Sequence, residues 1–154
     1  MMKKAKGVAE SRAVISAVMM PAHANHYGSV HGGTILRLID DVAFVVATRH
    51  ARKNVVMASM DHISFDCPVN IGDIVTLRGQ LSHVGHSSMD VEVEIETEKL
   101  KIGKVIKVGS AYITMVALDD EGKASGVPGL LLKTSREKLK SKEILARRKQ
   151  RLSR

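Results

Sequence analysis

The chain has 154 residues, of which 44% are hydrophobic and 3% aromatic, and its formal net charge is +8. This length supports one domain with a substantial core, and the hydrophobic content is ordinary for a soluble globular protein. No apolar run reaches the length of a membrane span. The single cysteine, Cys67, excludes an internal disulfide and suits a reducing compartment, so we expect a cytoplasmic protein.

The positive charge belongs to the C-terminal segment. Residues 133–154 carry ten Lys or Arg against two Glu, whereas residues 1–132 carry fourteen charges of each sign. Such a segment can bind nucleic acid or another anionic surface. A solvated helix or frayed end is the simpler interpretation, and a third is that a few of the cations meet the phosphates of a ligand. We expect neither a nucleic-acid partner nor a membrane partner.

The first predicted elements are a strand and a long helix. Residues 11–20, rich in Val, Ile and Met, predict a strand that ends at Pro21, and a polar loop follows. A helix is predicted from about Gly32 to His50, because apolar side chains recur at three- and four-residue spacing. These are Ile35, Ile39, Val42 and Val46.

Four strands and a second helix follow. Residues 55–66, 74–84 and 104–118 read as strands separated by turn residues. Between the last two, Met89, Val91, Val93 and Ile95 alternate with Asp90, Glu92, Glu94 and Glu96. This alternation predicts a half-buried antiparallel strand with one face open to water. Thr134-Ser-Arg-Glu137 is a capping-box pattern and predicts the start of a C-terminal helix.

The order of strand, helix, four strands and helix predicts an α+β fold. A single long helix followed by a meander suggests an antiparallel sheet curled round that helix. We expect one domain over residues 11–132 and a basic C-terminal helix or tail over residues 133–154.

The stretch from Asn25 to Ala43 offers groups suited to chemistry. Asp40 lies beside the apolar face of the helix, where a carboxylate is costly to bury unless it is paired or used. Asn25 and His31 lie in the preceding loop, and Gly32-Gly33 stands where the helix begins. Unpaired backbone N–H groups at a helix start favour negative charge.

Several motifs in this order resemble the hotdog-fold acyl-CoA thioesterases, and most closely their cytosolic acyl-CoA hydrolase branch. They are Asn25-His-Tyr-Gly-Ser-Val-His-Gly-Gly-Thr34, Leu38-Ile-Asp-Asp-Val-Ala43, Ser59-Met-Asp-His-Ile-Ser-Phe65, Gly72-Asp73 and Ser87-Ser-Met-Asp-Val91. The resemblance covers about residues 12–132.

The resemblance implies a hydrolase that releases a free fatty acid and CoA by carboxylate-assisted attack of water. Asp40 would be the base or the nucleophile, Asn25 would position the water, and the Gly33 N–H would stabilise the oxyanion. This chemistry needs a base and an oxyanion site but no strong acid, because a thiolate leaves easily. The substrate-binding residues would be His31, Gly32, Ser87 and Ser88. The last two would contact the phosphates or the pantetheine of CoA.

Each assignment has a simpler alternative. Asp40 can be a helix carboxylate paired with Arg37 or solvent, and Asn25 can close a turn through local backbone bonds. Ser87 and Ser88 can be an ordinary strand start. Four further histidines, His50, His62, His83 and His86, are expected at the surface or at strand ends.

The family also implies partners. A chain with one hotdog unit is expected to form a homodimer, or a trimer of dimers, with Asn25 and Asp40 of one site supplied by different subunits. No metal and no cofactor are expected, since CoA is part of the substrate. A non-catalytic acyl-CoA sensor on the same fold is the main functional alternative.

Overall fold

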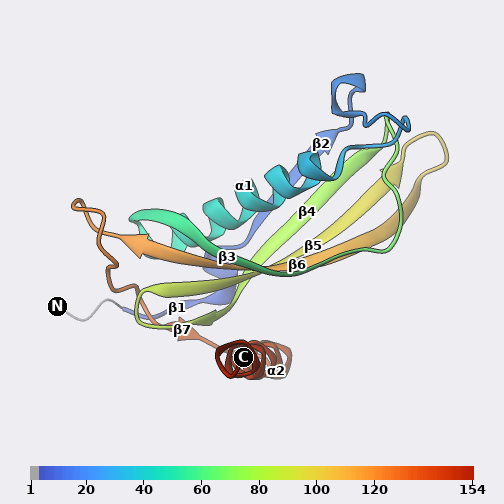
Figure 1. Ribbon diagram of the computed structural model, residues 1–154. Coiled ribbons are helices and arrows are strands. Elements are labelled where there is room, and N and C mark those ends of the chain that lie inside the picture. Colours follow the sequence, from blue (N-terminus) through green and yellow to red (C-terminus); the bar gives the residue numbers. More distant parts are fainter. Residues whose placement is uncertain (1–3) are drawn as a thin grey trace.

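A computed structural model describes residues 4–154 and consists of a five-stranded antiparallel sheet with a helix on each face (Figure 1). The strands are ordered β2-β4-β5-β6-β3, so β2 and β3 form the two edges. Their bounds are β2 Ala13–Val18, β3 Asn54–Phe65, β4 Ile74–Val84, β5 Ser88–Lys99 and β6 Lys104–Leu118. A short parallel pair, β1 (Lys6–Gly7) and β7 (Leu130–Leu131), ties the start of the chain to the segment before the last helix.

The long helix α1 (Gly32–Ala51) fills the curve of the sheet. Its buried side chains, Ile35, Ile39, Val42, Ala43, Val46 and Ala47, pack with inward-facing apolar residues of the strands to form the core. The helix packs tightly against β4 at Gly79, where a Cβ atom would lie 3.1 Å from Val46 and 3.2 Å from Val42. The predicted curled sheet round one central helix is therefore confirmed.

The second helix, α2 (Ser135–Leu152), lies across the other face of the sheet (Figure 1). The predicted capping box is present, because Thr134 Oγ1 accepts from Glu137 N at 3.1 Å and Glu137 Oε2 accepts from Thr134 N at 3.2 Å. Ile144 is buried against the sheet. The segment is therefore a helix whose outer side is solvated, as one form of the simpler interpretation held, and it is not a frayed end.

The exposed acidic face predicted for the strand over residues 89–96 is also corrected. Asp90 and Glu92 are buried, each with 4% of its surface exposed, because α2 covers that part of β5. Lys140 Nζ lies 2.8 Å from Glu92, and Arg148 Nη2 lies 3.0 Å from Asp90. The alternation correctly assigned these acids to one face of β5. It did not predict that this face is buried, because the cations that pair with the acids lie far along the sequence.

A histidine prediction fails in a similar way. His50 is fully buried rather than at the surface, and its Nε2 lies 2.7 Å from the carbonyl oxygen of Pro128. Burial lowers the pKa of His50, and it also lowers the pKa of the partly buried His83.

Neither helix of residues 4–154 has the length and apolar character needed to cross a membrane.

Candidate active site

The start of α1 presents backbone donors at the protein surface. His31 is the residue that caps α1, and its Nδ1 accepts a hydrogen bond from Gly33 N at 3.0 Å. Gly32 and Gly33 are both exposed, and a Cβ at Gly32 would meet no atom within 4 Å. The helix start is therefore open to a ligand, but the Gly33 N–H is already used by the His31 ring. A ligand oxygen that binds this N–H must replace the imidazole nitrogen.

Asn25 closes a turn in the loop that precedes α1. Its Oδ1 accepts from Tyr27 N at 2.9 Å and from Ser29 N at 3.2 Å, and its Nδ2 donates to Ser29 Oγ at 2.9 Å. Gly28 within this turn has a φ of +84°, which glycine adopts without strain. The local turn role of Asn25 is therefore present, and these bonds also fix where its amide lies.

Asp40 lies on the outer surface of α1, away from the sheet. It shares this exposed side with Gly33, Arg37 and Phe44, which are spaced three and four residues apart. No ion pair joins Asp40 to Arg37 within residues 4–154. The form of the simple alternative in which Arg37 pairs with Asp40 is therefore absent, whereas the carboxylate is exposed to solvent, as the other form of that alternative holds.

One chain does not bring Asp40 and the Gly33 N–H to the same atom. Seven residues of α-helix rise about 10 Å. The free N–H groups of a helix start also point away from the rest of the helix, so an oxygen bound at Gly33 lies farther still from Asp40. A base and an oxyanion donor must each lie about 3 Å from the reacting group. A complete site therefore needs a second copy of one of them.

Ser87 and Ser88 lie at the opposite end of the sheet from Asn25. The Ser87 carbonyl accepts from Ala117 N at 2.9 Å, next to the end of β6. The start of α1 lies at the other end, where Val30 N donates to Val69 O at 2.9 Å. Within one chain, the structure therefore brings Asn25, His31, Gly32 and Gly33 together and leaves the two serines apart from them.

Exposed apolar side chains lie on α1 one turn from Asp40 and on the edge strand β3. Phe44 on α1 is 49% exposed, and on the edge strand β3 the exposed apolar residues are Val56, Met57 and Phe65. A free strand edge with apolar residues next to it is suited to pairing with another chain. These residues give the protein an exposed apolar surface next to a free strand edge.

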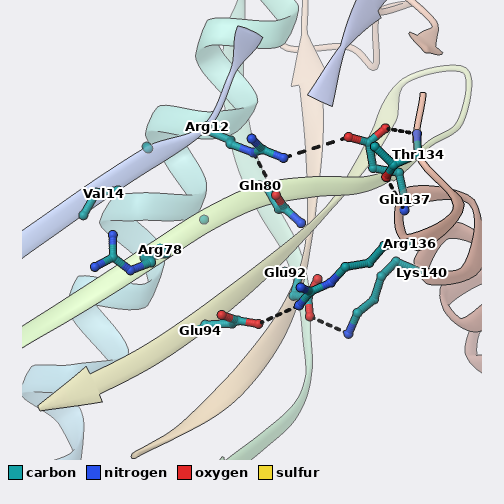
Figure 2. A pocket seen from close by; sticks show the side chains of 12 residues that line it. Arg12, Val14, Arg78, Gln80, Glu92, Glu94, Thr134, Arg136, Glu137 and Lys140 are labelled. Atoms are coloured by element: carbon teal, nitrogen blue, oxygen red, sulfur yellow. Dashed lines mark hydrogen bonds and ion pairs between the residues drawn. The ribbon is translucent and has the colours of Figure 1, made fainter. Parts of the chain in front are cut away.

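A groove of about 560 Å³ lies on the other face of the sheet (Figure 2). Its cations are matched by acids, since Lys140 lies 2.8 Å from Glu92 and Arg136 lies 3.7 Å from Glu94. It is lined by Arg12, Ala13, Val14, Arg78, Gly79, Gln80, Glu92, Glu94, Thr134, Arg136, Glu137 and Lys140. None of the predicted site residues lines this groove, so it is separate from the predicted chemistry.

The model of the thioesterase superfamily matches residues 27–104, which include the start of α1 and Asp40. The chain belongs to this superfamily. The cytosolic acyl coenzyme A thioester hydrolase of Mus musculus is 33% identical over 138 residues, which are 88% of this chain and 36% of that protein. The uncharacterized acyl-CoA thioester hydrolase YkhA of Bacillus subtilis is 36% identical over 83% of this chain and 74% of its own length. This chain thus spans about a third of the mammalian relative and most of the bacterial one.

Solved structures of thioesterases have the same fold. A crystal structure of an apo-hexameric acyl-CoA thioesterase matches with a TM-score of 0.93 and 32% identity, over 98% of this chain and 97% of that one. An acyl-CoA hydrolase of Staphylococcus aureus, solved with butyryl coenzyme A, coenzyme A and coenzyme A disulfide, matches with a TM-score of 0.88 and 34% identity, over 96% and 90%. These matches extend over α2 as well as the sheet, and they establish the hotdog fold for this thioesterase-superfamily chain.

Proposed function

We propose that this protein hydrolyses acyl-CoA thioesters to a free fatty acid and CoA. The observation that carries the proposal is the arrangement on α1, where exposed backbone donors at the helix start share one surface with an exposed, unpaired carboxylate. The names of the relatives and of the neighbouring structures support an acyl-CoA substrate. The Staphylococcus aureus enzyme was also solved with an Asp and with an Asn changed to Ala, and these two residues have the same separation in sequence as Asn25 and Asp40.

In the proposed mechanism, the thioester carbonyl oxygen binds the Gly33 N–H in place of His31 Nδ1, and Gly32 leaves room for its approach. Asp40 of the other subunit removes a proton from water, and the water oxygen bonds to the carbonyl carbon. Asn25 holds this water through its amide. The C–S bond then breaks, and the CoA sulfur takes the proton from Asp40. The Asp40 carboxylate can also attack the carbon directly, and this route gives the same products after hydrolysis of the acyl intermediate. Neither route requires a metal or another cofactor.

A twofold axis supplies the missing half of each site. Two α1 helices that lie side by side and antiparallel place Gly33 of one subunit beside Asp40 of the other if the axis passes near Arg37. Each pair of subunits then has two equivalent sites. The same arrangement directs the Ser87 and Ser88 end of one sheet towards the Asn25 end of the other, where they contact CoA. A trimer of such dimers agrees with the hexameric state of the neighbouring structures. The name of the mammalian relatives supports a cytoplasmic location.

The first experiment compares thiol release from short to long acyl-CoAs by wild type, Asp40→Asn and Asp41→Asn. Asp41 is a matched control because it is the adjacent carboxylate of the same helix and is also exposed. We expect Asp40→Asn to lower kcat by about 10²- to 10⁴-fold, the range for loss of a general base, with CoA binding retained. Equal rates for Asp40→Asn and wild type would remove Asp40 from the mechanism. Binding of acyl-CoA by wild type without turnover would instead favour the sensor.

Co-expression of Asn25→Ala with Asp40→Asn tests whether sites are shared between subunits. A mixed dimer then contains one site with both residues intact and one with both changed. Random pairing makes half of the dimers mixed, so we expect about a quarter of wild-type activity from two variants that are each inactive. If both residues of a site come from one chain, the mixture stays inactive.

A further inference from the structure

The guanidinium of Arg148 joins α2 to the β4–β5 hairpin and to β5. Its Nη2 donates to Ser88 Oγ at 3.1 Å and lies 3.0 Å from both carboxylate oxygens of Asp90. The contact is shielded from water, since the Asp90 side chain is 6% exposed and that of Arg148 is 24% exposed. Thr114 Oγ1 donates to Asp90 Oδ1 at 2.7 Å and holds the carboxylate from the other side.

The hairpin itself is tightly packed. Gly85 N donates to Ser88 O at 2.8 Å, and a Cβ atom at Gly85 would lie 2.8 Å from Ser88 Oγ. The next carbonyls along the hairpin are also used, because His86 O accepts from Val127 N and Ser87 O accepts from Ala117 N, each at 2.9 Å. The backbone of the hairpin is thus fixed by the main chain, and Arg148 is the side chain that fixes Ser88.

We propose that Arg148 is a positioning residue that orients the Ser88 hydroxyl, in the hairpin of residues 85–88, to bind the CoA part of the substrate. The inference rests on the proposed function, and it assigns to α2 a role in substrate affinity. Arg148 itself touches neither the acyl group nor the reacting carbonyl, which bind at the α1 surface.

The direction of the hydrogen bonds supports this role. A guanidinium only donates, so the Ser88 hydroxyl must accept from Arg148. Its single hydrogen remains to be donated to another acceptor. CoA presents acceptors of this kind in its phosphate oxygens and in the amide carbonyls of its pantetheine. Arg148 therefore orients the Ser88 hydroxyl as a donor, and the Asp90 carboxylate fixes the guanidinium that does so.

Arg148→Lys separates positioning from folding. Lysine keeps a positive charge opposite Asp90, but its side chain is one bond shorter, so its ammonium does not reach the position of Nη2, the atom with which Arg148 contacts both Asp90 and Ser88. Arg147→Lys is the matched control, since the adjacent Arg147 lies over the Tyr112 ring at 4.6 Å and has no hydrogen bond to the hairpin in the described residues. Each variant is assayed with an acyl-CoA and with the same acyl group on N-acetylcysteamine, which lacks the nucleotide and most of the pantetheine.

We expect Arg148→Lys to raise KM for acyl-CoA by about fivefold to tenfold, the size of one lost hydrogen bond, with kcat within about twofold of wild type. Activity on the N-acetylcysteamine thioester should be unchanged, and Arg147→Lys should behave as wild type on both substrates. An unchanged KM for acyl-CoA would overturn the proposal. An equal loss on both substrates would also overturn it, because it would indicate a general structural defect.

Calorimetric titration with CoA alone keeps this test independent of turnover. Weaker CoA binding by Arg148→Lys than by Arg147→Lys supports the positioning role even if wild type hydrolyses no thioester, an outcome that would refute the proposed function alone. Equal CoA affinity in the two variants would refute the role of Arg148.

Discussion

The ion pair between Lys140 and Glu92 is expected to hold α2 on the sheet. The Glu92 side chain is 5% exposed and lies 2.8 Å from Lys140 Nζ. Lys140→Met leaves the carboxylate under α2 without its cation. Breaking a buried pair in this way costs about 3–5 kcal/mol. Because the Lys140 side chain is 24% exposed, water replaces part of the lost interaction, and we expect a loss of about 1–3 kcal/mol in the free energy of unfolding.

Urea unfolding followed by far-UV circular dichroism measures this loss at a fixed protein concentration, since association also stabilises the folded state. The hydrogen bond that Lys140 donates to the Glu92 carboxylate raises the pKa of Lys140. The contribution is thus fully present below the ordinary lysine value of 10.5 and is lost as pH rises through the raised folded value. Measurement at pH 7 is therefore suitable.

Two further variants complete the test of this ion pair. Lys138→Met is the control, because Lys138 is an exposed lysine of the same helix. The double change Lys140→Met with Glu92→Leu should recover most of the loss, since an apolar pair replaces a buried ion pair at little cost. A Lys140→Met protein as stable as Lys138→Met, or a double variant no more stable than Lys140→Met, would refute the reasoning.

Three other outcomes are expected. His31→Ala removes the cap of α1 and should lower the free energy of unfolding by about 1 kcal/mol in thermal unfolding. Because the change also frees the Gly33 N–H, kcat should stay within a few-fold of wild type. A complete loss of turnover would contradict the displacement of His31 by substrate. Burial keeps His50 neutral in the folded state, so the unfolded chain takes up more protons below pH 6.5. Stability should fall as pH drops from 6.5 towards the lowered pKa, and His50→Gln should reduce this slope in urea titrations. Phe44→Glu places a charge on the proposed twofold surface, and it should shift sedimentation towards smaller species and lower activity together; a variant that sediments as wild type would argue against that surface.

The long elements were predictable because their signals are local. The predicted helix from Gly32 to about His50 corresponds to α1, Gly32–Ala51, and the predicted last strand over residues 104–118 has the bounds of β6. Both have apolar side chains at the spacing of one secondary structure over many residues. The cap of α2 was also readable, since it depends on residues only three positions apart.

What covers the sheet was not predictable in this way. Alternation in β5 assigned Asp90 and Glu92 to one face, but burial of that face depends on cations 58 and 48 residues farther along the chain. The sequence also predicts the proposed catalytic site only in part. The sequence singles out Asn25, Gly33 and Asp40 as candidates, but the geometry of one helix keeps the last two apart. In the proposed dimer, the distance between their reacting groups depends on how two chains pack together.

The late position of α2 in the sequence has a consequence for synthesis. On the ribosome, β5 is complete well before Lys140 and Arg148 are added. At about 5–20 residues per second, the interval between Lys99 and Arg148 lasts about 2–10 s. During that time the acids of β5 have no cations from α2 and are hydrated. They keep the growing sheet from exposing an apolar outer surface. We therefore expect the carboxylates that pair with α2 in the finished protein to oppose aggregation of the nascent chain until that helix is made.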